Sequence, residues 1–390
     1  MGRLTLKQMI LNKCEEERGL AGRLAELSGY NSGSSLMKIL KDEKKEFAKF
    51  YGLVKIVRYL FPYEEKMLLA EYAATLDPKK QTARLMLEYL NINHLNEAQD
   101  DLISKMANCS NLESKEYAKV YEIDRQYVKG ELSFNDAVVN FSSLQLKYTE
   151  TKLIADIMKS YCYLDEHEYN MIFKTLSPVE NLFSEIKDEY LSSVLYFRYA
   201  ILMVGHYVRK QQIIKVRDIC WSLINQSNDE YFVSFAYLHL GNSYMVESYD
   251  KSYNFLMRGY ELVKDKHGRI EFGLRNSINF VSNLWKKDTV ILDIKSENVS
   301  DVHEVAFYYI QHDQFGMGEK TLDTLNFNSL TLNQKAFHKY YRGILNNSMK
   351  DFTDSIKYFK QSGDFFYRQL PIMKLKEMNL PDCVLEALAE

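Results

Sequence analysis

Short polar side chains and lysines gather between residues 31 and 45, where their types fit the chemistry of nucleic-acid recognition. Hydroxyl and amide side chains can hydrogen-bond to base edges in the major groove, and lysines can pair with phosphates. The candidate DNA-binding residues are Asn31, Ser32, Ser34, Ser35, Lys38, Lys41, Lys44 and Lys45. The pattern predicts contact with double-stranded DNA; a solvated helical face is the alternative explanation.

Asparagines recur inside apolar helical patterns in the second half of the chain. They are Asn242, Asn276, Asn279 and Asn283, with Asn225 and Asn228 at the end of another such pattern. An asparagine within a helix lowers helix propensity unless its amide has a use. The amide offers a donor and an acceptor, so a row of asparagines can bind the backbone of an extended peptide. Helix caps and exposed faces are the alternative explanation for at least half of them.

Motifs for catalysis or cofactor binding are missing from the sequence. The eight histidines are isolated, and neither an HExxH metal motif, a glycine-rich phosphate loop nor a GxSxG nucleophile elbow occurs. The five cysteines are scattered and form no CxxC pair, which disfavours both a zinc site and a disulfide framework. The sequence therefore predicts a protein that is not an enzyme and needs no metal or cofactor.

The candidate DNA-binding residues follow the spacing of a helix-turn-helix. After a helix expected over residues 6–17, apolar residues recur over 20–27, a turn follows at 28–30, and a second apolar pattern covers 36–40. Ala25 is small enough for two helices to cross closely, and Gly29 provides the positive φ that the tight turn requires. Residues 31–35 would then cap the second helix and expose its N-terminal end to the groove.

The rest of the chain has the period of stacked helical hairpins. The stretch from Phe235 to Tyr260 carries two short amphipathic patterns and resembles a tetratricopeptide hairpin, with Gly241 allowing close approach of the partner helix. Gly343 follows Gly241 by 102 residues, about three times the roughly 34-residue repeat, and Gly205 precedes it by 36. Because one hairpin cannot bury its apolar face, we expect copies to stack beside it.

The predicted fold class is all-α, because only five prolines and sixteen glycines interrupt 390 residues. We expect a helix-turn-helix domain with a linker helix over residues 1–62, ending at Pro62. A tetratricopeptide-like, right-handed helical solenoid would follow over 63–390 and carry peptide binding and dimerisation. Asp77-Pro78 is expected to open one of its helices, and Lys286 to Asn298 to form a loop or extended segment.

Charge separates the predicted head from the body. Residues 1–60 hold twelve Lys and Arg against seven Asp and Glu, a balance of +5, which leaves −8 for the rest of the chain. A basic head suggests a polyanionic partner. The N-terminus has no apolar signal region and no run of eighteen apolar residues occurs, so we expect a cytoplasmic protein without membrane contact.

The last predicted helix, at residues 381–390, is expected to expose an apolar face. Its members are Val384, Leu385 and Leu388. A terminal repeat has no following repeat to cover it, so we expect a two-fold partner there and a homodimer.

Three stretches carry a resemblance to a known family. CSNLESKEYAKVYEIDRQYVKGEL at 109–132, LGNSYMVESYDKSYNFL at 240–256 and IKYFKQSGDFFYRQLPIMKLKEM at 356–378 resemble the arbitrium receptors of temperate phages. The resemblance implies a homodimeric transcription regulator of the lysis-lysogeny decision in the host cytoplasm. Such a regulator binds an inverted operator and is switched off by a short linear signal peptide that contains an arginine.

The same resemblance implies peptide-binding residues. Asp364 matches the acidic residue that receives the peptide arginine, and Glu304 lies where a second carboxylate is expected, which would give charge-assisted hydrogen bonds. Arg217 and Asn228 resemble the group that holds the peptide carboxylate and backbone, while Asn242 and Asn279 belong to the asparagine row. One alternative is a solenoid peptide receptor that regulates a phosphatase-like or response-regulator protein target. Another is a passive repeat scaffold.

Overall fold

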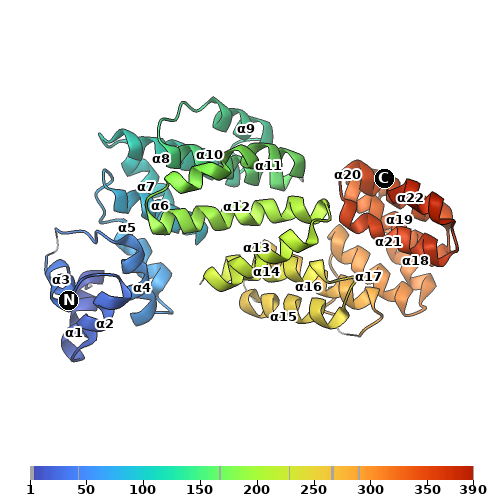
Figure 1. Ribbon diagram of the computed structural model, residues 1–390, viewed down its shortest axis with the longest axis horizontal. Helices are drawn as coiled ribbons and strands as arrows, with labels where there is room; N and C mark the ends of the chain where they lie inside the picture. The colour runs from blue at the N-terminus through green and yellow to red at the C-terminus, as the bar shows by residue number, and fades with distance from the viewer. Residues whose placement is uncertain are drawn as a thin grey trace. The chain divides into compact units, whose positions relative to one another are not determined.

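The computed structural model describes residues 4–42, 44–166, 168–227, 229–264, 268–288 and 290–389. Throughout these residues the chain forms 22 α-helices, two short 3-10 helices and no strand, which confirms the predicted all-α class (Figure 1). The chain divides into two compact units, unit 1 (Met1–Tyr199) and unit 2 (Ala200–Glu390).

Unit 1 begins with the predicted helix-turn-helix. Helices α1 (Leu6–Glu16), α2 (Leu20–Leu27) and α3 (Gly33–Leu40) pack on one another, and Ala25 is buried between them. Gly29 has φ 73°, as the tight turn requires. Ser32 caps α3: its Oγ accepts from the Ser35 backbone N–H at 3.2 Å, and the Ser35 Oγ accepts from the Ser32 N–H at 3.2 Å.

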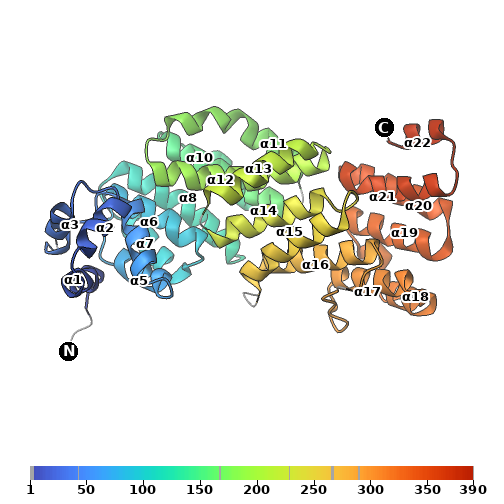
Figure 2. The same cartoon turned by 60° about the horizontal axis from the view of Figure 1, so that its bottom comes forward.

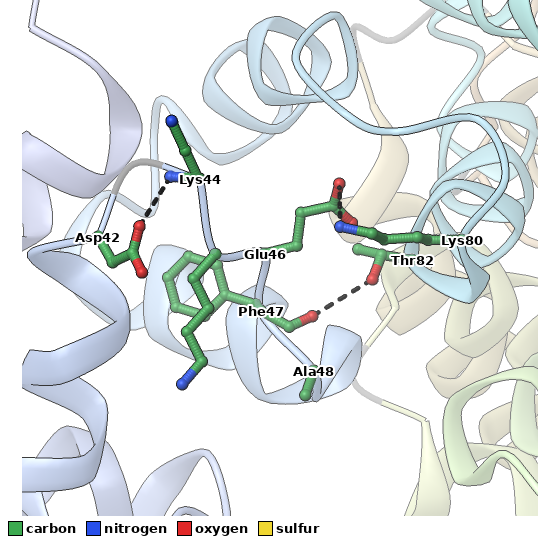
Figure 3. Close-up of a pocket in the computed structure, with 8 residues that line it drawn as sticks. Asp42, Lys44, Glu46, Phe47, Ala48, Lys80 and Thr82 are labelled. Carbon is green, nitrogen blue, oxygen red and sulfur yellow. Dashed lines mark hydrogen bonds and ion pairs between the residues drawn. The ribbon is translucent and has the colours of Figure 1, made fainter.

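Helix α4 (Phe50–Leu60) follows a non-helical segment, residues 45–49, which is bonded to the segment before α6 and to the start of α6. The Glu46 carboxylate accepts from the Asp77 N–H at 2.9 Å and lies 3.4 Å from Lys80 Nζ, while Thr82 Oγ1 donates to the Phe47 carbonyl at 3.3 Å (Figure 3). The proposed boundary between residues 62 and 63 therefore falls inside one compact unit.

The rest of unit 1 consists of further helices, most of which pack against neighbours in chain order. They are α5 (Glu65–Ala73), α6 (Gln81–Ile92), α7 (Asn96–Ala107), α8 (Leu112–Val128), α9 (Phe134–Ser143), α10 (Thr149–Asp165), α11 (Tyr169–Leu176), the 3-10 helix Ser177–Glu185, and α12 (Glu189–Arg209), which continues into unit 2. The prediction that Asp77-Pro78 opens a helix is wrong. The Asp77 carboxylate accepts from the Lys79 N–H at 3.0 Å in a turn, and α6 begins at Gln81.

Unit 2 is a stack of helical hairpins, as predicted for a solenoid. After the end of α12 it contains α13 (Ile213–Gln226), α14 (Glu230–Ser243), α15 (Tyr249–Val263), α16 (Arg269–Leu284), α17 (Val299–Gln311), α18 (Phe315–Asp323), the 3-10 helix Phe327–Ser329, α19 (Leu332–Asn346), α20 (Met349–Ser362), α21 (Phe365–Glu377) and α22 (Asp382–Ala389). Each helix packs against the next, and α14, α15 and α16 lie side by side in both views (Figures 1 and 2).

Two further segments of unit 2 can be compared with the predictions from sequence, namely residues 286–298 and the terminal helix α22. Within the described residues of 286–298 there is no helix, as expected. In α22, Val384 is 41% exposed but Leu385 is only 7% exposed, which corrects the expectation that Leu385 is free for a partner. The reason is that α22 packs against α21 of its own chain.

Gly241 should be intolerant of a side chain, because a Cβ there would lie 2.6 Å from Leu256 Cγ and 3.1 Å from the Ser252 carbonyl oxygen. We expect Gly241→Ala to lower the free energy of unfolding by about 1–3 kcal/mol, although alanine is the better helix former. The matched control is Gly273→Ala, in the interior of α16, where a Cβ would meet one atom, Leu238 Cδ2 at 3.4 Å. Urea unfolding that ranks the two variants equally would contradict the close-packing role of Gly241.

Candidate functional site

A cavity of about 240 Å³ opens within unit 2 among α14, α16, α17, α19 and α21. Its lining is aromatic and polar, and consists of Asn242, Asn276, Ser277, Phe280, Ser300, His303, Glu304, Asn333, Gln334, Phe337, Tyr341 and Tyr367. These described lining residues include no lysine or arginine. Burial and the neighbouring His338 lower the pKa of His303 to about 3, so this histidine is neutral.

The cavity has more hydrogen-bond acceptors than its own donors satisfy. The Oδ1 atoms of Asn242 and Asn276 are buried and accept no hydrogen bond from any residue that the structure describes. Buried polar atoms without partners are costly, and a cavity lined by them fits a molecule that supplies N–H donors. Together with the Glu304 carboxyl, these oxygens favour a group that supplies N–H donors.

Glu304 is the ionisable group of this lining whose pKa lies closest to neutrality. Its Oε2 accepts from Asn283 Nδ2 at 3.1 Å and its Oε1 accepts from the Tyr341 hydroxyl at 3.1 Å. Burial raises the pKa of the Glu304 carboxyl to about 8, and the charge of Asp301 acts in the same direction. The two hydrogen bonds favour the ionised form but do not outweigh burial, so the carboxyl is protonated at pH 7.

The free energy of unfolding should therefore fall as the pH rises from about 5 to about 8. Over this range native Glu304 keeps a proton that the unfolded chain, with an ordinary pKa of 4.5, has already lost. Glu304→Gln should remove this contribution, so the variant gains stability relative to the parent protein as pH rises. Urea unfolding between pH 5 and 8 measures the difference, with exposed Glu297→Gln as the control. Identical pH slopes for Glu304→Gln and the parent protein would contradict the assignment.

Asp364 lies directly behind this lining. It is 2% exposed and caps α21, its Oδ1 accepting from the Tyr367 N–H at 3.1 Å. Its Oδ2 accepts from Asn333 Nδ2 at 3.1 Å and pairs with Arg209 Nη1 at 3.0 Å. Since Asn333 and Tyr367 both line the cavity, the structure brings the neighbourhoods of Asp364 and Glu304 together. Arg209 and Asn333 could not be predicted from the sequence, because no local pattern marks a partner this far along the chain.

Asn279 binds backbone groups, but they belong to its own chain. Its Nδ2 donates to the Ile291 carbonyl at 3.1 Å and its Oδ1 accepts from the Ile291 N–H at 2.6 Å. Arg217 is also paired within unit 2, with Ser243 O at 2.8 Å and Glu247 at 2.5 Å, while stacking on Tyr244. Asn228 lies outside the described residues. Of the six predicted peptide contacts, Asn242 and Glu304 line the cavity directly.

The predicted DNA-binding side chains lie at the N-terminal end of α3, at Lys38 in its last turn, and along the segment that follows it. All are exposed except Ser35, which is partly exposed because it takes part in the cap of α3. Lys44 and Lys45 also line an open hollow of about 450 Å³, with Asp42, Glu46 and Lys80 beside them (Figure 3). The carboxylates of Asp42 and Glu46 in this hollow offset part of the lysine charge.

Over the described part of the chain, no three His, Cys, Asp or Glu side chains are grouped so that they could hold a metal ion. A search of the same residues finds no helix with the length and apolar character needed to cross a membrane.

Comparison with known proteins gives a consistent result. Residues 65–377 match the family described as AimR transcriptional regulator-like. The chain is 32% identical over 371 residues to the AimR transcriptional regulator of Bacillus phage phi3T, covering 95% of this chain and 97% of the relative. It is 28% identical over 376 residues to the AimR transcriptional regulator of Bacillus phage SPbeta, covering 96% of each.

Solved structures agree with the sequence relatives. A structure of selenomethionine phAimR superposes with a TM-score of 0.82 at 31% identity, covering 99% of this chain and 100% of phAimR. A structure of phAimR with ligand gives a TM-score of 0.76 at 30% identity, covering 87% of this chain and 100% of that one.

Proposed function

The chain belongs to the AimR family of transcriptional regulators, and we propose that it acts as a peptide-responsive DNA-binding protein of the phage lysis-lysogeny decision. In this proposal it binds an operator as a homodimer in the host cytoplasm, and a short linear peptide that contains an arginine switches it off. A transcriptional regulator family is not a class of enzymes, in agreement with the missing catalytic motifs.

The observation that carries the proposal is the acceptor-rich cavity of unit 2. A guanidinium offers five N–H donors in a plane, which suits the unpaired oxygens of Asn242 and Asn276 and the carboxyl of Glu304. Ligand binding by a solved relative, phAimR, supports a ligand site in this family. We propose Glu304, Asn242 and Asp364 as the arginine end of the site, with Arg217, Asn228 and Asn279 as further contacts of the peptide or of the backbone around it.

We propose residues 1–62 as the DNA-binding domain and 63–390 as the peptide-binding and dimerisation domain. Exposed Asn31, Ser32 and Ser34 would face the base edges, Ser35 would hold the cap, and the lysines at 38, 41, 44 and 45 would contact phosphates. Val384, which is exposed, and Leu388, which is partly exposed, are proposed as partner contacts. Leu385 would support that face from within the protomer.

A gel shift with the DNA that flanks the gene tests this function directly. We expect a specific complex that weakens as salt concentration rises, and an arginine-containing peptide that reduces it. Failure to bind any flanking DNA, together with capture of a response-regulator or phosphatase-like protein, would favour the alternative of a protein target.

A further inference from the structure

Within unit 2, the last residue of α12 and the two residues after it contact the start of α21. Arg209 Nη1 lies 3.0 Å from Asp364 Oδ2, and Gln211 Nε2 donates to the Phe365 carbonyl. Lys210 Nζ lies 4.8 Å from the centroid of the Phe365 ring. We name these contacts the 209–211 clamp. It ties residues 209–211 to the penultimate helix of unit 2.

The clamp occupies the acceptor positions of a buried carboxylate. Asp364 is 2% exposed, and the side chain of Arg209 is 16% exposed. Each carboxylate oxygen has room for about two donors. Asp364 Oδ2 already accepts from Asn333 and Arg209, and Oδ1 accepts from the Tyr367 N–H. A second guanidinium that pairs with both oxygens needs a free position on each, and Oδ2 has none.

We propose that Arg209 is an internal occupant of the acidic subsite at Asp364, which the arginine of a ligand in the adjacent cavity must displace. The cavity adjoins Asp364, because Asn333 and Tyr367 both hydrogen-bond to Asp364 and also line the cavity. The inference rests on the proposed function, in which the cavity takes an arginine.

The exchange has consequences for specificity and for the state of unit 2. The affinity of a ligand for this subsite depends on the free energy with which its guanidinium pairs with Asp364, less the free energy of the Arg209–Asp364 pair. A ligand with a neutral side chain is a weaker donor and therefore cannot displace Arg209. A ligand that succeeds releases the end of α12 from the cap of α21. Binding therefore replaces a link between residues 209 and 364 of the chain by a link to the ligand.

The test uses acetyl-arginine amide as the probe, with neutral acetyl-citrulline amide as its isostere, titrated against the full chain by calorimetry or NMR. Arg209→Gln should bind acetyl-arginine amide on the order of tenfold more tightly than the parent protein, because the competitor is gone. Binding of the citrulline probe should stay unchanged. Asp364→Asn should bind the arginine probe weakly with either residue at 209.

Gln211→Ala is the matched control, since it removes a clamp hydrogen bond and leaves the charge of Arg209 in place. The affinity of Gln211→Ala for the arginine probe should rise much less than that of Arg209→Gln, because the cation that competes for Asp364 is still present. Arg209→Lys keeps a cation beside Asp364 and guards against misfolding of the glutamine variant; we expect about threefold tighter binding, since lysine pairs as a point charge. Equal or weaker probe binding by folded Arg209→Gln overturns the proposal. Operator binding by the parent protein is measured separately, so this outcome leaves the DNA-binding function standing.

Discussion

Ser34→Glu should lower the affinity of the protein for its operator by about 100-fold or more. If the start of α3 enters the major groove, the new carboxylate is brought against phosphates and base acceptors, and like-charge contacts of this kind cost several kcal/mol. Gel shifts or fluorescence anisotropy with operator DNA measure the loss. Unchanged affinity would remove the start of α3 from the DNA interface.

The structure makes Ser34 the better position for this experiment than its neighbour. Ser34 is exposed in the first turn of α3, whereas Ser35 completes the cap with Ser32. A carboxylate in the first turn interacts favourably with the helix dipole, so Ser34→Glu should not unfold the head. Ser34→Gln is the control of similar size without charge, and we expect it to retain most of the affinity. Thermal unfolding of both variants separates a loss of DNA contact from a loss of fold.

Arg198→Ala should lower the free energy of unfolding of unit 1 by about 3–5 kcal/mol, because it leaves a buried carboxylate without its cation. Arg198 Nη1 donates to Glu88 Oε1 at 2.8 Å and to Asn91 Oδ1 at 3.0 Å. Glu88 is fully buried, and its other oxygen accepts from the Tyr121 hydroxyl. The pair links α6 to α12 across 110 residues of sequence. Urea unfolding monitored by circular dichroism measures the loss.

An exposed ion pair in the same unit provides the control for Arg198→Ala. Arg23 pairs with Glu17, and their side chains are 53% and 57% exposed. Arg23→Ala should leave the free energy of unfolding nearly unchanged, because water and salt screen such pairs. Equal effects of the two substitutions would mean that burial does not set the strength of the Glu88–Arg198 pair.

Local sequence was sufficient to predict the helical class and the positions where backbone geometry restricts the type of residue. Apolar spacing predicted the helical class, Gly29 marked a turn with positive φ, and Gly241 marked a close helix contact. The loop after α16 was also visible, because the apolar period stops there. Each of these properties depends on neighbours within a few residues of the chain, so the pattern is present in the sequence itself.

The pairing of polar groups was decided by the tertiary structure alone. The sequence predicts that the amide of Asn279 binds the backbone of a peptide. In the folded stack this amide bonds to Ile291 of its own chain. Leu385 belongs to an apolar face, but α21 covers it. The family resemblance made Asp364 a candidate carboxylate, whereas its partner Arg209 lies 155 residues earlier in the sequence. Nothing in a linear pattern specifies which distant side chain a superhelical stack brings to a buried charge, because that choice depends on the accumulated packing of every helix between them.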